Sequence, residues 1–598
     1  MVTLLADGTD HHAAMRALEH GWDLVTPLPF GRALNAAINA RAGTIEDVDA
    51  ILCGEEASDP GTAARVAAID ALAARARLFE LADQDDVIAT LLRRSLAPDA
   101  PLGVRERLQI ATARRAAMAG LLMVEQSDLV IAVWDGLTVD SVGGTGHTAW
   151  AALELGVPVV WIDPAQPEHW RIFHTAEELA ADQSQESVQA RRALGEHIRQ
   201  MLTLQPPRTG GRFAGIAAIG PESWRAGSNA QSHIYRRIEA LFGRRKWSER
   251  FGSLRQRYER PQEIGEGSAK ALLAAVAGLP GQDPALAGKI EREVLQRFAR
   301  ADGIASNLAD RYRSGMVLNF VMGAAAIIVG TLYLPLVPVE YKWVFASLEL
   351  ALLVAIVFNT ARGQRRRLHG RWFESRRAAE YLRHSPFLLA AGVSRAAGRW
   401  PQGVKSWWPE WYVRHALSAV GLQHVKVDDD YLRGMLALLR DHHVGPQLAY
   451  HRDKAARLAK VHHRLDALSE YSFAAAIMVV GTYLILALLG YLGSVDSGLV
   501  AKSAKWFTVA AVALPTLGGA VAAIRYFGDF ERFAEISEVT AGKLEPIASR
   551  IDLLIVAPSE RLDFAAVAKI VHDADDVVFS EIENWQAVFS GKRTTIPA

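Results

Sequence analysis

The stretch "SDLVIAVWDGLTVDSVGGTGHTAW", Ser127 to Trp150, joins a short apolar strand pattern to a glycine-rich turn. A segment of helical composition follows the turn. Gly143 and Gly144 let the backbone approach an anion closely, and Thr145 offers a hydroxyl group or caps the helix. Because a helix N-terminus presents unpaired N–H groups, the turn is a candidate phosphate-binding site. A plain structural turn is the alternative.

The same alternation of strand and helix patterns extends over residues 1–205. Short β-rich runs separated by Ala-rich helical segments recur as "VTLLA", "DLVTPL", "RLFEL", "DLVIAVW" and "PVVWID". They predict an α/β domain with a Rossmann-like parallel sheet, which binds ligands at the carboxyl ends of its strands. Gly8 and Asp10 follow the first run, and Asp135 and Gly136 follow the fourth. These four residues therefore join the candidate ligand-binding set.

Four apolar runs appear in the second half of the chain, and each is close to the ~20 residues that cross a bilayer as a helix. They predict an all-α membrane domain with four transmembrane helices in two hairpins. Basic residues flank the pairs while the hairpin loops carry few charges, so we expect a multi-pass protein of the inner (plasma) membrane with both termini in the cytoplasm. Buried helices of a large soluble protein are the alternative. The runs are roughly Met316 to Leu336, Trp343 to Phe358, Tyr471 to Leu489 and Trp506 to Ile524.

The two hairpins resemble each other in sequence. Gly330-Thr331 corresponds to Gly481-Thr482, and a long polar helix is predicted before each pair of spans. We interpret this as a duplication, with chance similarity between apolar segments as the alternative. The tryptophans of "WPQGVKSWWPEWY", residues 400–412, suit either a membrane interface or packing between helices.

Five units are predicted along the chain. They are a nucleotide-binding α/β domain (1–205), a connector (206–281), a first two-span module (282–400), an interfacial aromatic and helical connector (401–447) and a second two-span module with a C-terminal cytoplasmic segment (448–598).

Charge and cysteine content argue against several classes of protein. Lys+Arg and Asp+Glu balance at 66 each, which gives no reason to expect nucleic acid as a partner. The only cysteine is Cys53, which rules out an intramolecular disulfide and a cysteine-rich zinc site. Adjacent histidines such as His11 and His12 usually point apart, so we expect no metal site. No cofactor is expected other than a nucleotide-derived ligand.

Parts of the sequence resemble two known families. "GTDHHAAMRALEHGWDLVTPLPF", followed by "SDLVIAVWDG" and "GGTGHTAWAALELGVPVVWI", looks like the SLOG domains, sensors related to TRPM-channel N-terminal domains and to the LOG nucleotide hydrolases. This similarity covers roughly residues 1–175. The paired spans with "FESRRAAEYLR" resemble SLATT modules, the two-span effectors that accompany SLOG sensors in prokaryotic conflict systems. The resemblances imply a membrane effector that opens pores when its sensor binds a nucleotide-derived signal.

One position of the LOG pattern separates a sensor from an enzyme. The hydrolases carry G-G-x-G-T-x-x-E, in which the glutamate takes part in cleaving a glycosidic bond. This chain has His147 at the Thr position and Trp150 at the Glu position, and an indole cannot do the work of an acid. Glu154, one turn later, could substitute for it. We therefore assign no catalytic residue.

These observations favour a membrane-anchored sensor–effector, and the resemblances imply an antiviral defence role. Its expected partners are a nucleotide-like small molecule, the lipid bilayer and further copies of itself in a homo-oligomer. The alternatives are a membrane-tethered nucleotide-processing enzyme of the LOG-like N-glycosidase type and an ion channel without a defence role.

Glu349 is the candidate pore residue, because it lies about two turns inside the second span, in "WVFASLELALL". An ionisable residue at that depth costs roughly 2.5–3.5 kcal/mol on insertion scales, so Glu349 should face protein or water rather than lipid. The alternative is a position near the outer interface, since Lys342 and Trp343 mark that boundary.

Overall fold

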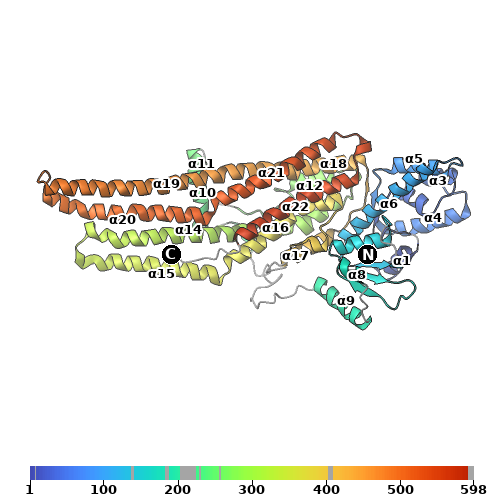
Figure 1. Ribbon diagram of the computed structural model, residues 1–598, viewed down its shortest axis with the longest axis horizontal. Coiled ribbons are helices and arrows are strands. Elements are labelled where there is room, and N and C mark those ends of the chain that lie inside the picture. The colour runs from blue at the N-terminus through green and yellow to red at the C-terminus, as the bar shows by residue number, and fades with distance from the viewer. Residues whose placement is uncertain are drawn as a thin grey trace.

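The α/β part of the chain lies at one end of an elongated molecule, and four long helices extend to the other end (Figure 1). The structure is a computed structural model. It describes residues 1–6, 8–136, 141–181, 187–202, 224–227, 230–244, 246–252, 254, 257–401 and 408–589.

The strands form two sheets of three strands each. The first sheet has the order β1-β2-β6 and is parallel throughout. The second has the order β3-β4-β5, with β3 and β4 parallel and β4 and β5 antiparallel. The predicted parallel pairing is therefore present, but the strands are divided between two small sheets. Their bounds are β1 (Leu24–Leu28), β2 (Ala76–Leu81), β3 (Val130–Val133), β4 (Val159–Ile162), β5 (Arg171–Phe173) and β6 (Val425–Val427).

Four of the five predicted β-rich runs form strands, and the first run does not. "VTLLA" contributes an isolated parallel bridge between Val2 and Val25. Strands β5 and β6 were not predicted from the sequence. Strand β6 comes from the segment between the two hairpins and pairs with β2, with Phe79 opposite Val425.

The helices of the α/β part precede or follow these strands. Two begin at a side-chain cap, since the Thr44 hydroxyl accepts from Asp47 N–H and the Asp59 carboxylate accepts from Thr62 N–H. Their bounds are α1 (Thr9–Glu19), α2 (Arg32–Asn39), α3 (Ile45–Cys53), α4 (Pro60–Ala73), α5 (Asp85–Leu96), α6 (Leu102–Glu125), α7 (Thr145–Glu154), α8 (Ala176–Ala180) and α9 (Ser187–Leu202).

Short helices occupy the described part of the predicted connector, whose residues 206–223 lie outside the described chain. These helices are α10 (Ile234–Gly243), α11 (Trp247–Phe251) and α12 (Lys270–Ala277). Helix α13 (Leu286–Lys289) lies at the start of the predicted first module.

The long helices pass without interruption from polar to apolar sequence. The polar helices predicted before each pair of spans are continuous with the first span of the pair, as α14 and α19. Helix α14 has 41 residues, and at about 1.5 Å per residue it is about 60 Å long, twice the ~30 Å apolar core of a bilayer. The two modules are α14 (Gln296–Leu336), α15 (Lys342–Arg365) and α16 (Leu368–Ala391), and α19 (Gly445–Tyr491), α20 (Ser497–Gly528) and α21 (Phe530–Ile555).

Four helical segments are long and apolar enough to cross a membrane: Leu286–Leu336, Val339–Arg365, Asp429–Tyr491 and Ser497–Ile555. Their apolar windows are mostly exposed, at 6–22% buried. A contiguous apolar surface of this extent is unfavourable in water and is favourable against lipid. The helices are therefore not the buried helices of a soluble core. Examples of the exposed side chains are Ile327, Leu350, Val354, Phe358, Ile477, Met478, Leu484 and Leu488.

The two modules share an order of elements that supports the duplication. A π-helical segment precedes the long helix in each, η4 (Ile290–Leu295) before α14 and η7 (Arg440–Val444) before α19. A left-handed residue then separates the second span from the next helix, Arg367 with φ 46° in one module and Asp529 with φ 44° in the other. Left-handed backbone is uncommon for residues other than glycine, so its occurrence at the same corner of both modules favours duplication over chance similarity.

Three further helices complete the fold, and the tryptophans beside α17 pack against protein. Trp400 and Trp408 are 3% and 2% exposed. The Trp400 indole donates to the Arg395 carbonyl and the Trp408 indole to the Glu374 carboxylate, at 3.2 and 2.9 Å. These two tryptophans therefore pack between helices and do not lie at a membrane interface. Residues 402–407 of the same stretch lie outside the described chain. The helices are α17 (Trp408–Val420), α18 (Asp429–Leu439) and α22 (Phe564–Phe589).

One hydrophobic core runs from the α/β part into the helical part. It contains Phe79 of β2 and Leu122 of α6 together with Leu388 of α16, Leu436 of α18 and Val571 of α22. The α/β part is consequently packed onto the helical modules rather than joined to them by a linker alone.

Candidate functional site

The predicted glycine turn combines one glycine with a packing role, Gly143, and one that is the N-cap of α7, Gly144. Gly143 has φ +80°, and a Cβ there would lie 2.6 Å from the Ala113 carbonyl of α6. Only glycine allows this close approach in a left-handed conformation. Gly144 is the N-cap of α7 with ordinary φ and ψ of −80° and 170°, and no side chain caps the helix.

In the described residues, no side chain caps the N-terminus of α7. Thr145 is exposed, and within the described residues no acceptor is seen for the N–H groups of Thr145, Gly146 and His147. Gly146 is buried, and the helix dipole favours an anion at this end of α7. The geometry is compatible with the predicted phosphate site, which stays a prediction.

Asp135 and Gly136 lie in the same β3–α7 loop as the glycine turn. Both are exposed at the carboxyl end of β3. Gly136 has φ +75°, and a Cβ there would lie 3.4 Å from the Trp161 ring. The Trp161 indole donates to the Trp134 carbonyl at 2.9 Å. The strand end is thereby fixed, while residues 137–140 of the loop lie outside the described chain.

Gly8 and Asp10 lie in a different loop, at the start of α1. Gly8 is the N-cap of α1 with φ +96°. Burial raises the pKa of the Asp10 carboxyl group, which lies in the first turn of α1. Gly8 and Asp10 therefore lie together at the start of α1, and their role in ligand binding stays a prediction.

The residue that could replace the missing catalytic glutamate is engaged by Trp150. The Trp150 indole donates to the Glu154 carboxylate at 3.1 Å along α7. A carboxylate held by a neighbouring indole on the helix surface is a weak candidate for an acid that must reach a glycosidic bond.

Protein groups fill part of the carboxyl edge of the first sheet, where ligands bind in open α/β sheets. Arg115 of α6 donates to the Pro29 carbonyl at 3.1 Å and forms an ion pair with Asp83 at 2.6 Å. Beside this pair, the Asp85 carboxylate accepts from the Gly31 N–H at 3.0 Å. The sequence analysis did not identify these residues, although the acidic run "ADQDD" directly follows β2.

Asp85 is expected to make the protein less stable at alkaline pH. Burial raises its pKa from 3.8 to about 7, despite nearby Arg115 and Lys426. Between about pH 4 and 7 the folded protein holds a proton that the unfolded chain releases, so stability rises as the pH falls through 7 and levels off below about 4. Asp85→Asn should therefore raise the melting temperature at pH 8 and change it little at pH 5.

Thermal unfolding of the purified full chain at both pH values measures this effect. Asp86→Asn, at the exposed neighbouring position, is the matched control. Equal melting temperatures for Asp85→Asn and the parent at pH 8 would show that the buried carboxylate carries no penalty.

Glu349 lies against the neighbouring span of its own hairpin. A Cβ at Gly330 of α14 would lie 2.6 Å from a Glu349 carboxylate oxygen, so the glycine makes room for this side chain. Glu349 is half-buried. At the corresponding position of the second hairpin, Gly481 has no atom within 4 Å of such a Cβ. The close approach belongs to the first hairpin, and the role of Glu349 in a pore remains a prediction.

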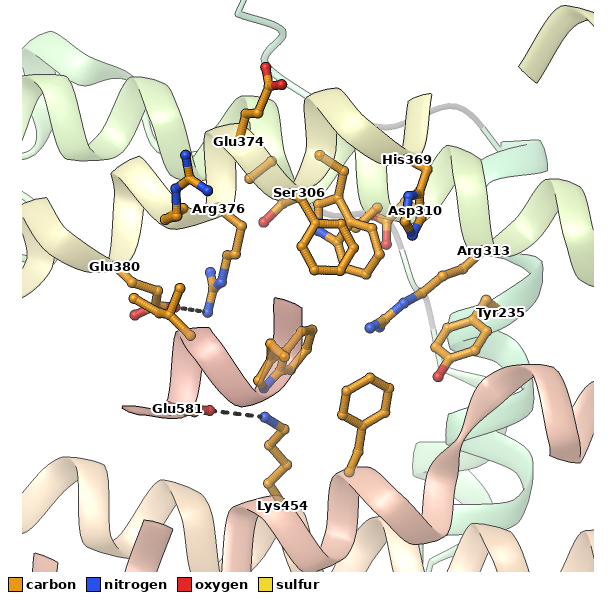
Figure 2. Close-up of a pocket in the computed structure, with 18 of the residues that line it drawn as sticks. Tyr235, Ser306, Asp310, Arg313, His369, Glu374, Arg376, Glu380, Lys454 and Glu581 are labelled. Atoms are coloured by element: carbon orange, nitrogen blue, oxygen red, sulfur yellow. Dashed lines mark ion pairs between the residues drawn. The ribbon is translucent and has the colours of Figure 1, made fainter. Parts of the chain in front are cut away.

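A large cavity lined by charged and aromatic side chains lies between the two helical modules, in a place that sequence reasoning missed. Its volume is about 800 Å³. Residues from six helices line it: α10, α14, α16, α19, α21 and α22. Figure 2 shows Arg313, Arg376 and Lys454 pointing toward its middle from different sides. The basic run after the second span was the available signal, but the run alone does not show which helices meet.

Comparison with protein-family models, with curated proteins and with solved structures finds no match to this chain.

Proposed function

We propose that this protein is a membrane-anchored sensor–effector. Its α/β domain, proposed to be Rossmann-like, binds a nucleotide or a nucleotide-derived signal at the β3–α7 turn. Binding changes the packing of the four spans and alters membrane permeability without a covalent step, in prokaryotic defence against phage.

The observation that carries this proposal is the continuous core between the α/β domain and the helical modules. Strand β6, from the segment that joins the two hairpins, pairs with β2 of the α/β domain. Helices α14 and α19 each run unbroken from the polar part of a module into its first apolar span. A change in the α/β domain therefore has a rigid path to the spans, provided that the ligand binds the two arrangements with different affinity.

Specific polar contacts also cross the boundary between the domain and the modules. Asp83 accepts from the Phe564 N–H of α22 at 2.9 Å. Glu125 of α6 forms an ion pair with His572 of α22 at 3.0 Å and accepts from the Ser394 N–H at 3.1 Å. These contacts fix the position of α6, which also packs against Gly143 of the candidate site.

The remaining parts of the proposal concern the membrane and the assembly. We propose an inner-membrane protein with both termini in the cytoplasm, because the basic residues lie at the ends of the spans nearest the α/β domain. A homo-oligomer is proposed because one copy supplies only four spans, and a pore needs a ring of helices around it.

Flux through liposomes tests the function. The purified full chain is reconstituted with entrapped potassium, and AMP, GMP, CMP and NAD are added in turn. We expect at least one of them to change the rate of potassium efflux about tenfold while chromatography recovers it intact. Unchanged efflux with all four would contradict the effector proposal. Release of a free base would instead identify the membrane-tethered nucleotide-processing enzyme.

Glu349→Gln tests the pore assignment. If several subunits place Glu349 around a pore, removing its charge should lower the preference for potassium over chloride several-fold, because a ring of carboxylates attracts cations. Nucleotide binding should not change. Reversal potentials in planar bilayers measure the preference, and Glu340→Gln in the exposed hairpin loop is the control. An ion preference equal to that of the parent would remove Glu349 from the pore lining.

A further inference from the structure

The cavity between the helical modules has an excess of positive charge. Eight arginine or lysine residues line it, against five aspartate or glutamate residues. Burial lowers the pKa of His369 and of His451 to about 4, so both imidazoles are neutral near pH 7. Burial also raises the pKa of Glu581, which faces Lys454 at 3.9 Å. The cavity is therefore suited to an anion.

Most of these cations already have carboxylate partners. Arg236 pairs with Asp310 at 2.6 Å, and Arg377 pairs with Glu410 at 2.7 Å. The others with partners are Arg367 with Glu374, Arg376 with Asp302 and Glu380, Arg383 with Glu380, and Lys454 with Glu581.

Arg313 differs from these cations because aromatic rings surround its guanidinium. It lies 4.9 Å from the ring centroids of Tyr235 and Trp372 and 5.7 Å from that of Phe533. In the described part of the chain no carboxylate lies within 4.0 Å of it. Rings fix the position of a guanidinium without neutralising it, which leaves its N–H donors for a phosphate.

The same wall offers aromatic faces close to the cations. Trp585 lies 4.5 Å from Phe533 and 6.3 Å from Trp372, measured between ring centroids. Lys454 lies over the Trp585 ring at 5.1 Å. A planar group that enters beside these rings gains stacking, while its phosphate reaches Arg313 or Lys454.

We propose that this cavity is a binding site for a phosphorylated ligand with a planar ring, of the nucleoside phosphate class. Arg313 and Lys454 receive the phosphate, and the ring lies beside Trp372 and Trp585. The volume of about 800 Å³ is within the usual range for small-molecule sites. The site is separate from the glycine turn and does not depend on the proposed function.

Such a ligand would bridge the two modules. Arg313 and Trp372 belong to α14 and α16 of the first module, whereas Lys454 and Phe533 belong to α19 and α21 of the second. Binding would therefore favour the arrangement in which the two hairpins approach each other at the ends of the spans.

Binding to the full chain in nanodiscs of uncharged phosphatidylcholine tests the proposal. The chain carries Gly144→Glu, so that binding at the glycine turn does not contribute. We expect AMP to bind at least tenfold more tightly than adenosine or inorganic phosphate in calorimetry. Light-activated 8-azido-AMP should label α16 or α22, as mapped by mass spectrometry.

Variants assign the site to individual residues. Arg313→Gln and Lys454→Gln should each weaken AMP binding at least tenfold. Arg452→Gln should leave it unchanged, because Arg452 is exposed on α19 and pairs with Glu545. Melting temperatures show which variants fold, and the Lys454 variant keeps the test valid if Arg313→Gln unfolds.

Three results would overturn the proposal. One is AMP affinity equal to that of the parent in both folded variants, and another is labelling confined to the α/β domain. The third is that AMP does not bind in phosphatidylcholine nanodiscs and that phosphatidylglycerol protects the cavity from photolabelling. This result would assign the cavity to a lipid headgroup. Liposome flux is not used in this test, so failure of the sensor–effector proposal would not affect its outcome.

Discussion

Replacing Arg115 by alanine is expected to lower the free energy of unfolding by about 3–5 kcal/mol, because it leaves a buried carboxylate without its cation. The Arg115 and Asp83 side chains are 7% and 0% exposed. Arg115 also donates to the Pro29 and Leu81 carbonyls, so its loss leaves buried acceptors unpaired at the ends of β1 and β2.

Thermal unfolding and limited proteolysis of the purified full chain measure this loss. Arg93→Ala is the matched control, because Arg93 forms a comparable pair with Asp49 at 2.6 Å but both side chains are 40–49% exposed. Such a pair contributes about 0–1 kcal/mol. Arg115→Met combined with Asp83→Asn should recover part of the lost stability, since both charges are removed together. Similar losses for Arg115→Ala and Arg93→Ala would contradict the expectation.

Gly144→Glu is expected to weaken nucleotide binding at the β3–α7 turn at least a hundredfold. The new carboxylate lies where a phosphate would bind and competes for the open N–H groups of α7, and about 2.7 kcal/mol corresponds to a hundredfold. The backbone of Gly144 is ordinary, and a Cβ there would lie 3.1 Å from the Ser141 carbonyl, so the variant should fold with a small local shift.

Calorimetry with the nucleotide that changes flux measures this affinity in a chain that carries Lys454→Gln, so that binding in the cavity does not contribute. Gly103→Glu is the matched control, because Gly103 lies in the first turn of α6 with no atom within 4 Å of its Cβ position. Gly143→Ala should instead impair folding, since its Cβ would meet the Ala113 carbonyl at 2.6 Å. Unchanged affinity in folded Gly144→Glu would show that the turn only connects β3 to α7.

Local sequence patterns predicted four of the strands and the four long apolar helices, because their formation depends on nearby residues. The runs "DLVTPL", "RLFEL", "DLVIAVW" and "PVVWID" form strands, because β-rich apolar segments between helices pair in parallel. The four apolar runs form long helices, since hydropathy over ~20 residues depends only on composition. The glycine turn could also be located, because a turn and a helix start are local features.

Tertiary structure decided the features that join distant parts of the chain. "VKV" at 425–427 is too short to predict as a strand and forms one only because β2 offers an unpaired edge. Likewise, Arg313, Trp372 and Lys454 are more than 50 residues apart in sequence, and only the packing of two modules places them around one cavity.

The amino-acid sequence by itself determined the α/β alternation, the four long apolar helices and the glycine turn after β3, because each follows from the order of neighbouring residues. Only the tertiary structure decided that Gly143 contacts α6, that Asp83 and Arg115 close the sheet edge, and that a cationic cavity separates the modules. The physical reason is that burial and charge compensation depend on which surfaces meet, and those surfaces come from segments far apart in the chain.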